Sequence, residues 1–178
     1  MRQPLWVFGY GSLIWDPGFP VAERRLARAR GWRRGFCMWS IHHRGSMEEP
    51  GLVLALDHDP DSACDGVAFR VAEGAEAATL AGLRERELIS SAYLEDWLEV
   101  EAEGAALTAL CYVINRNHAQ YCGGLSAEEQ ARVIAAARGG KGENCDYLYA
   151  TAAHLAELGI ADAGLERLAA RVRALREG

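Results

Sequence analysis

Near its N-terminus the chain reads LWVFGYGSLIW (Leu5–Trp15), one of the most apolar stretches of its 178 residues. The first half of this stretch predicts a buried strand over Leu5–Tyr10. A strand that only filled a core would not need glycine, yet Gly9 and Gly11 interrupt it. Glycine permits unusual backbone angles and a close approach to the backbone. The stretch therefore predicts a core strand that ends in a bend, where another group lies close to bare backbone.

Outward from this strand, the sequence predicts an α+β protein. Strands are expected over 32–40, 52–57 and 67–71, with turns at 57–60 and 64–66, followed by a helix over 75–89, two strands over 93–101 and 107–114, and helices over 127–138, over 145–158 and after the capping residue Asp162. This order lacks the strict alternation of a doubly wound sheet. We therefore expect one domain, residues 1–178, with a mostly antiparallel or mixed sheet flanked by helices.

Composition argues against several classes of protein. The formal net charge is −6, whereas a nucleic-acid-binding protein needs a basic face. No apolar run approaches the roughly 18 residues of a membrane span, and the N-terminus does not resemble a signal peptide. The five cysteines are scattered without a C-x-x-C pair, which disfavours a zinc site or a disulfide framework and suits a reducing compartment. We expect a cytoplasmic protein with no nucleic-acid or membrane partner.

Two glycine-containing segments look like nucleotide-binding motifs but are incomplete. The segment 9–14 begins like G-x-G-x-x-G, yet it lacks the third glycine, and Pro17 disfavours the helix that should follow. The segment 138–142 lacks the first glycine of a phosphate-binding loop and the Ser or Thr after its lysine. His42 and His43 are adjacent, so on a strand they point to opposite faces and make poor joint metal ligands. We therefore expect neither a nucleotide site nor a metal site in these segments.

One carboxylate falls on the apolar side of the first predicted helix. At about 100° per residue, Glu87 lies between Leu80 and Leu83 on the helical wheel. Glu85 lies on the opposite, solvated side. Burying a carboxylate without a partner is costly, so Glu87 must be paired or must face a cleft. Two interpretations stay open: a structural one, with an ion pair to an arginine such as Arg84 or a frayed helix end, and a functional one, a general acid/base.

The bent strand and the off-pattern carboxylate together resemble the ChaC-type γ-glutamylcyclotransferases. The block WVFGYGSLIWDPGF over 6–19 is similar to the N-terminal signature of that family, and Arg86-Glu87-Leu88 with Tyr93 is similar to its RREM…GxY block. The other similar blocks, in order, are HRG at 43–45, PGLVLAL at 50–56, NRNHAQY at 115–121, LSAEEQARVIAAARG at 125–139 and Tyr147-Leu148.

The resemblance implies a fold, a reaction and a set of site residues. The fold would be γ-glutamylcyclotransferase-like, a small mixed β-barrel flanked by α-helices. The reaction would be cleavage of glutathione to 5-oxoproline and Cys-Gly, with neither a metal nor a cofactor. The resemblance places the catalytic glutamate on Glu87. It places the substrate-binding residues on Val7, Phe8, Gly9, Tyr10, Gly11, Ser12, Leu13 and Tyr147.

The chain also departs from the family pattern. Ser91 stands where glycine is common, and Ser46-Met47 replaces a common Thr-Pro. These changes leave Glu87 intact but bear on the side of the pocket that would hold the leaving group. One alternative is therefore a cyclotransferase acting on another γ-glutamyl peptide or a γ-glutamylamine. A non-catalytic regulatory module of the same fold is a further alternative, although such a module has no reason to keep a costly buried carboxylate.

Overall fold

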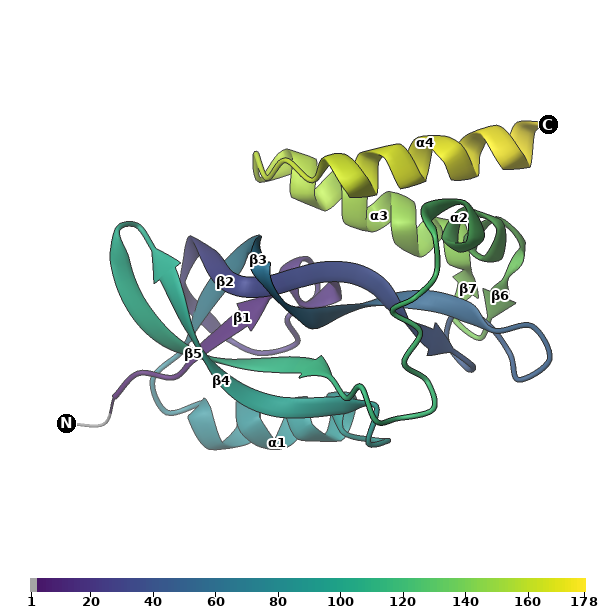
Figure 1. The fold of residues 1–178 in the computed structure, drawn as a ribbon. Coiled ribbons are helices and arrows are strands. Elements are labelled where there is room, and N and C mark those ends of the chain that lie inside the picture. Colours follow the sequence, from purple (N-terminus) through teal and green to yellow (C-terminus); the bar gives the residue numbers. More distant parts are fainter. Residues whose placement is uncertain (1–2) are drawn as a thin grey trace. The chain divides into compact units, whose positions relative to one another are not determined.

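All four predicted helices are present in the computed structural model, which describes residues 3–178 (Figure 1). The elements are β1 (Trp6–Gly9), the 3₁₀ turn η1 (Ser12–Ile14), β2 (Val21–Ser40), β3 (Gly51–Val71), α1 (Glu76–Glu87), β4 (Tyr93–Ala102), β5 (Ala105–Ile114), α2 (Ala127–Ala136), β6 (Arg138–Gly139), β7 (Gly142–Glu143), α3 (Asn144–Glu157) and α4 (Ala163–Glu177). They fall into two compact units. The first holds the described residues up to Arg34 and Ala55–His118, and the second holds Gly35–Leu54 and Ala119–Gly178. The single domain over residues 1–178 stays a prediction.

The first unit is built around a closed barrel with the strand order β1-β3-β2-β4-β5. In β1, Val7 lies opposite Phe69 of the antiparallel β3 and opposite Leu110 of the parallel β5. β4 and β5 form a hairpin whose turn residues, Glu103 and Gly104, have positive φ angles of 51° and 81°. Two consecutive positive φ angles are typical of a tight hairpin turn whose twist matches that of its strands. A mixed barrel with flanking helices confirms the predicted α+β class.

β3 corrects one prediction. It runs unbroken through 57–60 and 64–66, so the two turns expected there are wrong, and the strands expected over 52–57 and 67–71 are one strand. The acidic start of the first expected turn, Asp57, is instead buried and accepts a 2.6 Å hydrogen bond from Nε of Arg116. Cross-strand pairing outweighs the local turn propensity of these polar residues.

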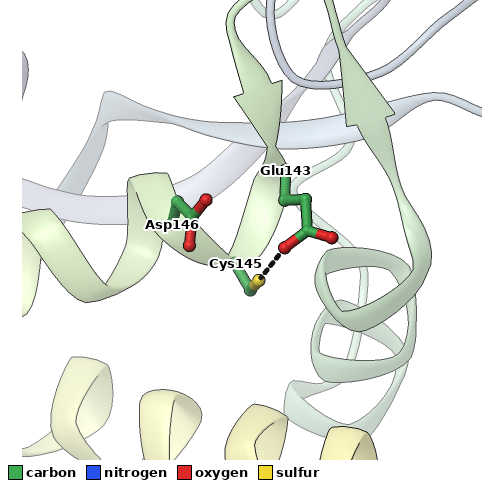
Figure 2. Close-up of side chains that lie close together, drawn as sticks. All are labelled: Glu143, Cys145 and Asp146. Carbon is green, nitrogen blue, oxygen red and sulfur yellow. Dashed lines mark hydrogen bonds between the residues drawn. The ribbon is translucent and has the colours of Figure 1, made fainter.

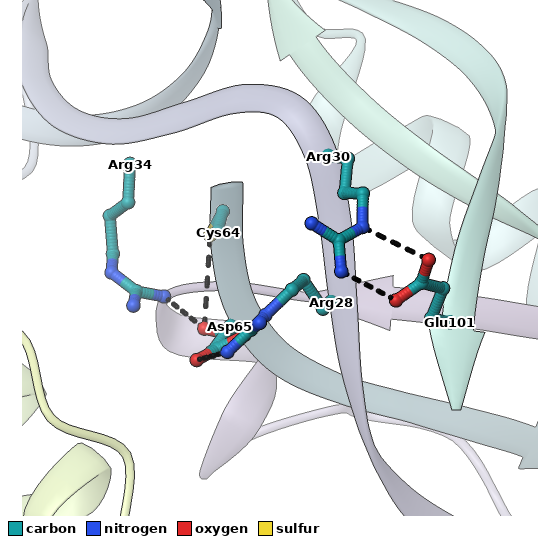
Figure 3. A network of polar contacts seen from close by, with 6 residues as sticks. All are labelled: Arg28, Arg30, Arg34, Cys64, Asp65 and Glu101. Carbon is teal, nitrogen blue, oxygen red and sulfur yellow. Dashed lines mark hydrogen bonds and ion pairs between the residues drawn. The ribbon is translucent and has the colours of Figure 1, made fainter. Parts of the chain in front are cut away.

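β2 is longer than expected for a related reason. Its first half is rich in arginine, and the pattern gives no apolar alternation there. Arg28 pairs with Asp65 of β3, and Arg30 pairs with Glu101 of β4 (Figure 3). These acid–base pairs across strands support a polar strand that hydrophobic patterning does not reveal.

α1 lies along β4 and β5 in the first unit (Figure 1) and packs against the outer face of the barrel. Leu83 of α1 joins a buried cluster with Val7 of β1, Leu110 and Tyr112 of β5, and Leu13 of η1. The same cluster therefore fixes the last turns of α1 and the segment that follows β1.

The helices of the second unit begin and end where their capping residues predict. Ser126 and Glu129 form a reciprocal capping box at the start of α2. The Asp162 side chain accepts a 3.0 Å hydrogen bond from the backbone N–H of Leu165 at the start of α4. Gly159, with a positive φ of 72°, follows the end of α3. Between residues 3 and 178, no helix has the length and apolarity that a membrane crossing requires.

A buried amide ties α3 to β3 in the second unit. Asn144 is fully buried. Its Oδ1 accepts a 2.8 Å hydrogen bond from the N–H of Leu52, and its Nδ2 donates a 2.8 Å hydrogen bond to the carbonyl of the same residue. One side chain thus satisfies both backbone groups of Leu52 where β3 begins.

Replacing Asn144 with Ala should lower the free energy of unfolding by about 2–4 kcal/mol, because two buried backbone groups lose their partner. Urea denaturation followed by circular dichroism measures this change. The matched control is Asn117→Ala, at an exposed position, which should stay within about 0.5 kcal/mol of wild type. Equal stabilities of the two variants would contradict this account of Asn144.

Candidate active site

The bend predicted after the first strand is present. β1 ends at Gly9, and η1 begins at Ser12. A Cβ on Gly9 would lie 3.1 Å from the Phe69 ring, and a Cβ on Gly66 of β3 would overlap the Gly9 carbonyl oxygen. Part of what approaches the bare backbone of the bend is therefore the chain itself, which the sequence did not reveal. The site residues expected just before the bend, Val7 and Phe8, are fully buried in β1.

Two hydrogen bonds from side chains fix the middle of the bend. The Tyr10 hydroxyl donates a 2.7 Å hydrogen bond to the carbonyl of Tyr112. Arg34 donates from Nη1 to the carbonyls of Tyr10, at 3.0 Å, and Asp65, at 2.9 Å, and Figure 3 shows the second of these contacts. Arg34 therefore ties the bend to β3 through backbone atoms. Sequence reasoning did not single out Arg34, because its partners are carbonyl groups that carry no signature.

Glu87 is the last residue of α1, and only 16% of its side chain is exposed. The helical wheel is confirmed in placing this carboxylate on the buried side. Its Oε1 lies 3.3 Å from Nε of Arg86. Other nitrogens of the same guanidinium donate hydrogen bonds to the hydroxyl of Ser12, at 3.2 Å, and to the carbonyl of Asp16, at 2.8 Å. One arginine thus contacts both the candidate acid/base and the turn that follows β1.

The expected ion pair of Glu87 with an arginine is present, but the partner is Arg86 and not the suggested Arg84. Arg84 instead makes a two-nitrogen contact, at 3.0 and 3.1 Å, with the carboxylate of Glu95 on β4. The frayed helix end is also wrong, because the N–H of Leu88 still donates to the carbonyl of Arg84, at 2.9 Å. Two arginines in one helical turn therefore serve different partners.

Tyr112 is a further polar group near Glu87. Its hydroxyl donates a 3.0 Å hydrogen bond to Oε1 of Glu95. Burial, this hydrogen bond and the negative charges of Glu95 and Glu87 hold the pKa of Tyr112 well above its usual range, so the phenol stays a neutral donor. The Arg84 guanidinium and the Tyr112 hydroxyl keep the pKa of Glu95 below its usual value. In the sequence, Tyr112 is marked only by its hydroxyl group within an otherwise apolar predicted strand.

Tyr147 belongs to the second unit, on α3. Its ring packs edge-on against Phe36, with centroids 6.0 Å apart, and the Arg44 guanidinium lies 5.6 Å from the ring centroid. Its hydroxyl accepts a 3.3 Å hydrogen bond from the N–H of Leu54. Among the expected site residues, Glu87 and Ser12 lie in the first unit and both contact Arg86. The substrate contact of Tyr147 stays a prediction.

One group of potential metal ligands lies at the start of α3 (Figure 2): Glu143, Cys145 and Asp146. The Glu143 carboxylate already contacts Nη2 of Arg176, at 3.2 and 3.1 Å. The Cys145 thiol donates to the same carboxylate, at 3.7 Å, and burial raises the pKa of this thiol. A metal-binding thiol must be deprotonated. These contacts fit an ion-paired helix terminus better than a metal site.

Comparison with known proteins places the chain in one family. Residues 5–175 match the family described as ChaC-like protein. The chain is 35% identical to the glutathione-specific gamma-glutamylcyclotransferase of Escherichia coli (strain K12), over 97% of this chain and 74% of that protein. It is 37% identical to the human glutathione-specific gamma-glutamylcyclotransferase 1, over 82% of this chain and 67% of that protein.

Solved structures show the same fold. The crystal structure of a yeast gamma-glutamyl cyclotransferase specific to glutathione superposes with a TM-score of 0.88. It is 24% identical in sequence, and the match covers 98% of each chain. This likeness confirms the expected γ-glutamylcyclotransferase-like fold.

Replacing Gly66 with Ala should lower the free energy of unfolding by about 1–3 kcal/mol, because the new methyl group overlaps the Gly9 carbonyl and forces the bend away from β3. Chemical denaturation measures the change. Gly35→Ala is the matched control on β2, since a Cβ there meets no atom within 4 Å, and it should be as stable as wild type or slightly more so. A Gly66→Ala variant of wild-type stability would show that the bend tolerates the displacement.

Proposed function

The chain belongs to the family of ChaC-like proteins, and we propose that it is an enzyme that cleaves glutathione into 5-oxoproline and cysteinylglycine. The relatives named for this activity cover most of the chain. The observation that carries the proposal is the contact of one guanidinium, that of Arg86, with both the mostly buried carboxylate of Glu87 and the turn at Ser12. A general acid/base and a substrate-binding turn are thereby neighbours.

In the proposed reaction the nucleophile is part of the substrate. The α-amine nitrogen of the γ-glutamyl group attacks its own side-chain carbonyl carbon and closes a five-membered lactam. The amide bond to the cysteine nitrogen then breaks. One proton leaves the α-amine and one reaches the departing cysteine nitrogen, so atoms and charge balance. A well-oriented intramolecular attack can reach effective molarities of ~10⁵ M or more, and the enzyme therefore needs no serine or cysteine nucleophile.

Glu87 carries the two proton transfers. Its carboxylate first accepts a proton from the α-amine and then returns one to the leaving nitrogen. A single positioned carboxylate serves both steps because they follow one another at neighbouring atoms. General acid/base catalysis of this kind contributes about 10²–10⁴-fold in rate.

The turn 9–13 holds the substrate in its folded form. Backbone N–H groups in a glycine-containing bend can bind the α-carboxylate of the γ-glutamyl group. Such donors also stabilise the oxyanion that develops on the side-chain carbonyl. We expect the reaction to need neither a metal nor a cofactor, so EDTA should leave it unchanged.

Glu87→Gln should lower kcat for 5-oxoproline and Cys-Gly release by about 10²–10⁴-fold, because the amide cannot accept the proton. The matched control is Glu85→Gln, on the exposed face of the same helix, which should keep wild-type kcat and KM. Both products are quantified by chromatography with glutathione as substrate.

Full activity of Glu87→Gln would remove Glu87 from the acid/base role. A wild-type protein that binds γ-glutamyl compounds without turning them over would instead favour a non-catalytic module of the same fold.

Glutathione should be the preferred γ-glutamyl substrate, with a kcat/KM about tenfold or more above those of γ-glutamyl-alanine and γ-glutamyl-lysine. Ser91 and Ser46-Met47 are the departures from the family pattern that make this comparison informative. A preference for either competitor would assign the chain to another γ-glutamyl peptide or amine while keeping the cyclisation chemistry.

A further inference from the structure

Arg86 divides its guanidinium among three partners. Nε lies 3.3 Å from Oε1 of Glu87, Nη2 donates to the Ser12 hydroxyl at 3.2 Å, and Nη1 donates to the Asp16 carbonyl at 2.8 Å. Gly18 completes the cradle: its φ is +74°, and a Cβ there would lie 3.5 Å from Nη1. The segment 12–18 therefore contacts the guanidinium through Ser12 and Asp16 and lies near it at Gly18.

The arrangement differs from that of an ordinary surface ion pair. Arg84, in the same helical turn, gives two nitrogens to the single carboxylate of Glu95. Arg30 does the same with Glu101 on the barrel. Exposed pairs of this kind contribute little beyond local order. Arg86 instead divides its nitrogens among a carboxylate, a hydroxyl and a backbone carbonyl, and so joins Glu87 of α1 to the turn that follows β1.

The geometry points to Arg86 as a positioning residue for the proposed reaction: its guanidinium fixes the Glu87 carboxylate relative to the turn that binds the γ-glutamyl group. This inference rests on the proposed function. The attacking amine is bound by the turn and deprotonated by Glu87, so the reaction depends on the spacing between these two parts. Displacing a catalytic group by about 1 Å can cost about 10²-fold in rate.

Only a planar fork can meet the three partners at once. A lysine ammonium in the same place keeps the positive charge and three N–H donors, but all three lie on one nitrogen, so it cannot replace donors on three separate nitrogens of a planar guanidinium. Charge alone therefore does not reproduce the function of Arg86. The Arg86→Lys substitution therefore distinguishes a geometric role of this side chain from an electrostatic one.

The test compares Arg86→Lys and Arg86→Ala with wild type, using glutathione turnover. Both variants should lose about 10²-fold in kcat, with a much smaller change in KM, because the bound substrate meets a misplaced base. Added ethylguanidinium should restore part of the kcat of Arg86→Ala and none of that of Arg86→Lys, whose side chain fills the cradle. A purely structural role would not produce this rescue.

Arg30→Ala is the matched control. It removes a two-nitrogen contact with Glu101 on the barrel surface (Figure 3) and should keep wild-type kcat, KM and response to ethylguanidinium. Thermal unfolding checks that each variant is folded. If Arg86→Ala does not fold, Arg86→Lys, which keeps the charge and an aliphatic stem, decides the question on kcat.

Wild-type kcat in a folded Arg86→Lys, or loss confined to KM, would overturn the positioning role and leave the proposed function intact. A wild-type protein that does not cleave glutathione would overturn the proposed function, and the inference about Arg86 with it.

Discussion

The candidate site depends on where one short strand ends. β1 has four residues and is paired on both sides, antiparallel with β3 and parallel with β5. Its central residues, Val7 and Phe8, are fully buried, so the strand cannot slide without moving side chains out of the core. The ladder with β3 stops at Gly9, opposite Val67, and the next residue of β3 is Gly66. The close approach of Gly66 to the Gly9 carbonyl leaves no room for a side chain where the chain leaves the barrel.

Side chains from other elements then hold the segment that has left the ladder. Arg34, on β2, binds the carbonyl of Tyr10, and Arg86, on α1, binds the hydroxyl of Ser12. The Tyr10 hydroxyl reaches back to the Tyr112 carbonyl on β5. Hydrogen bonds with a charged partner are stronger than neutral ones. The bend is thus ordered by the barrel and by α1 without belonging to a sheet.

Local periodicity accounts for what the sequence could predict. The buried side of α1, and Glu87 on it, followed from helical geometry, and the bend followed from glycines within an apolar strand. The errors concern residues whose ionic partners lie outside their own helix or strand. Local sequence predicts a turn at Asp57, but this residue lies within β3 and accepts a hydrogen bond from Arg116, 59 positions later. Helical spacing makes Arg84 the expected partner of Glu87, but Arg84 pairs with Glu95 on β4.

Long-range partners also explain the residues that were missed. The arginines of β2 meet acids 37 and 71 positions away, so no window of sequence shows that the segment is a strand. Arg34 and Tyr112 matter through carbonyl groups and through a carboxylate on a neighbouring strand. Such pairs can be identified only in the folded barrel, where the distant segments lie next to one another.

The reaction proposed for the site does not require an activated cysteine. Burial raises the pKa of the Cys122 thiol to about 12 and raises the pKa of the Cys111 thiol well above its usual range. These two thiols are therefore protonated near neutral pH and are poor nucleophiles. A reaction whose nucleophile is the substrate's own amine needs no activated side chain of that kind. It needs a carboxylate and a binding turn at a fixed separation, and in this chain the bridge between Glu87 and Ser12 is a single guanidinium.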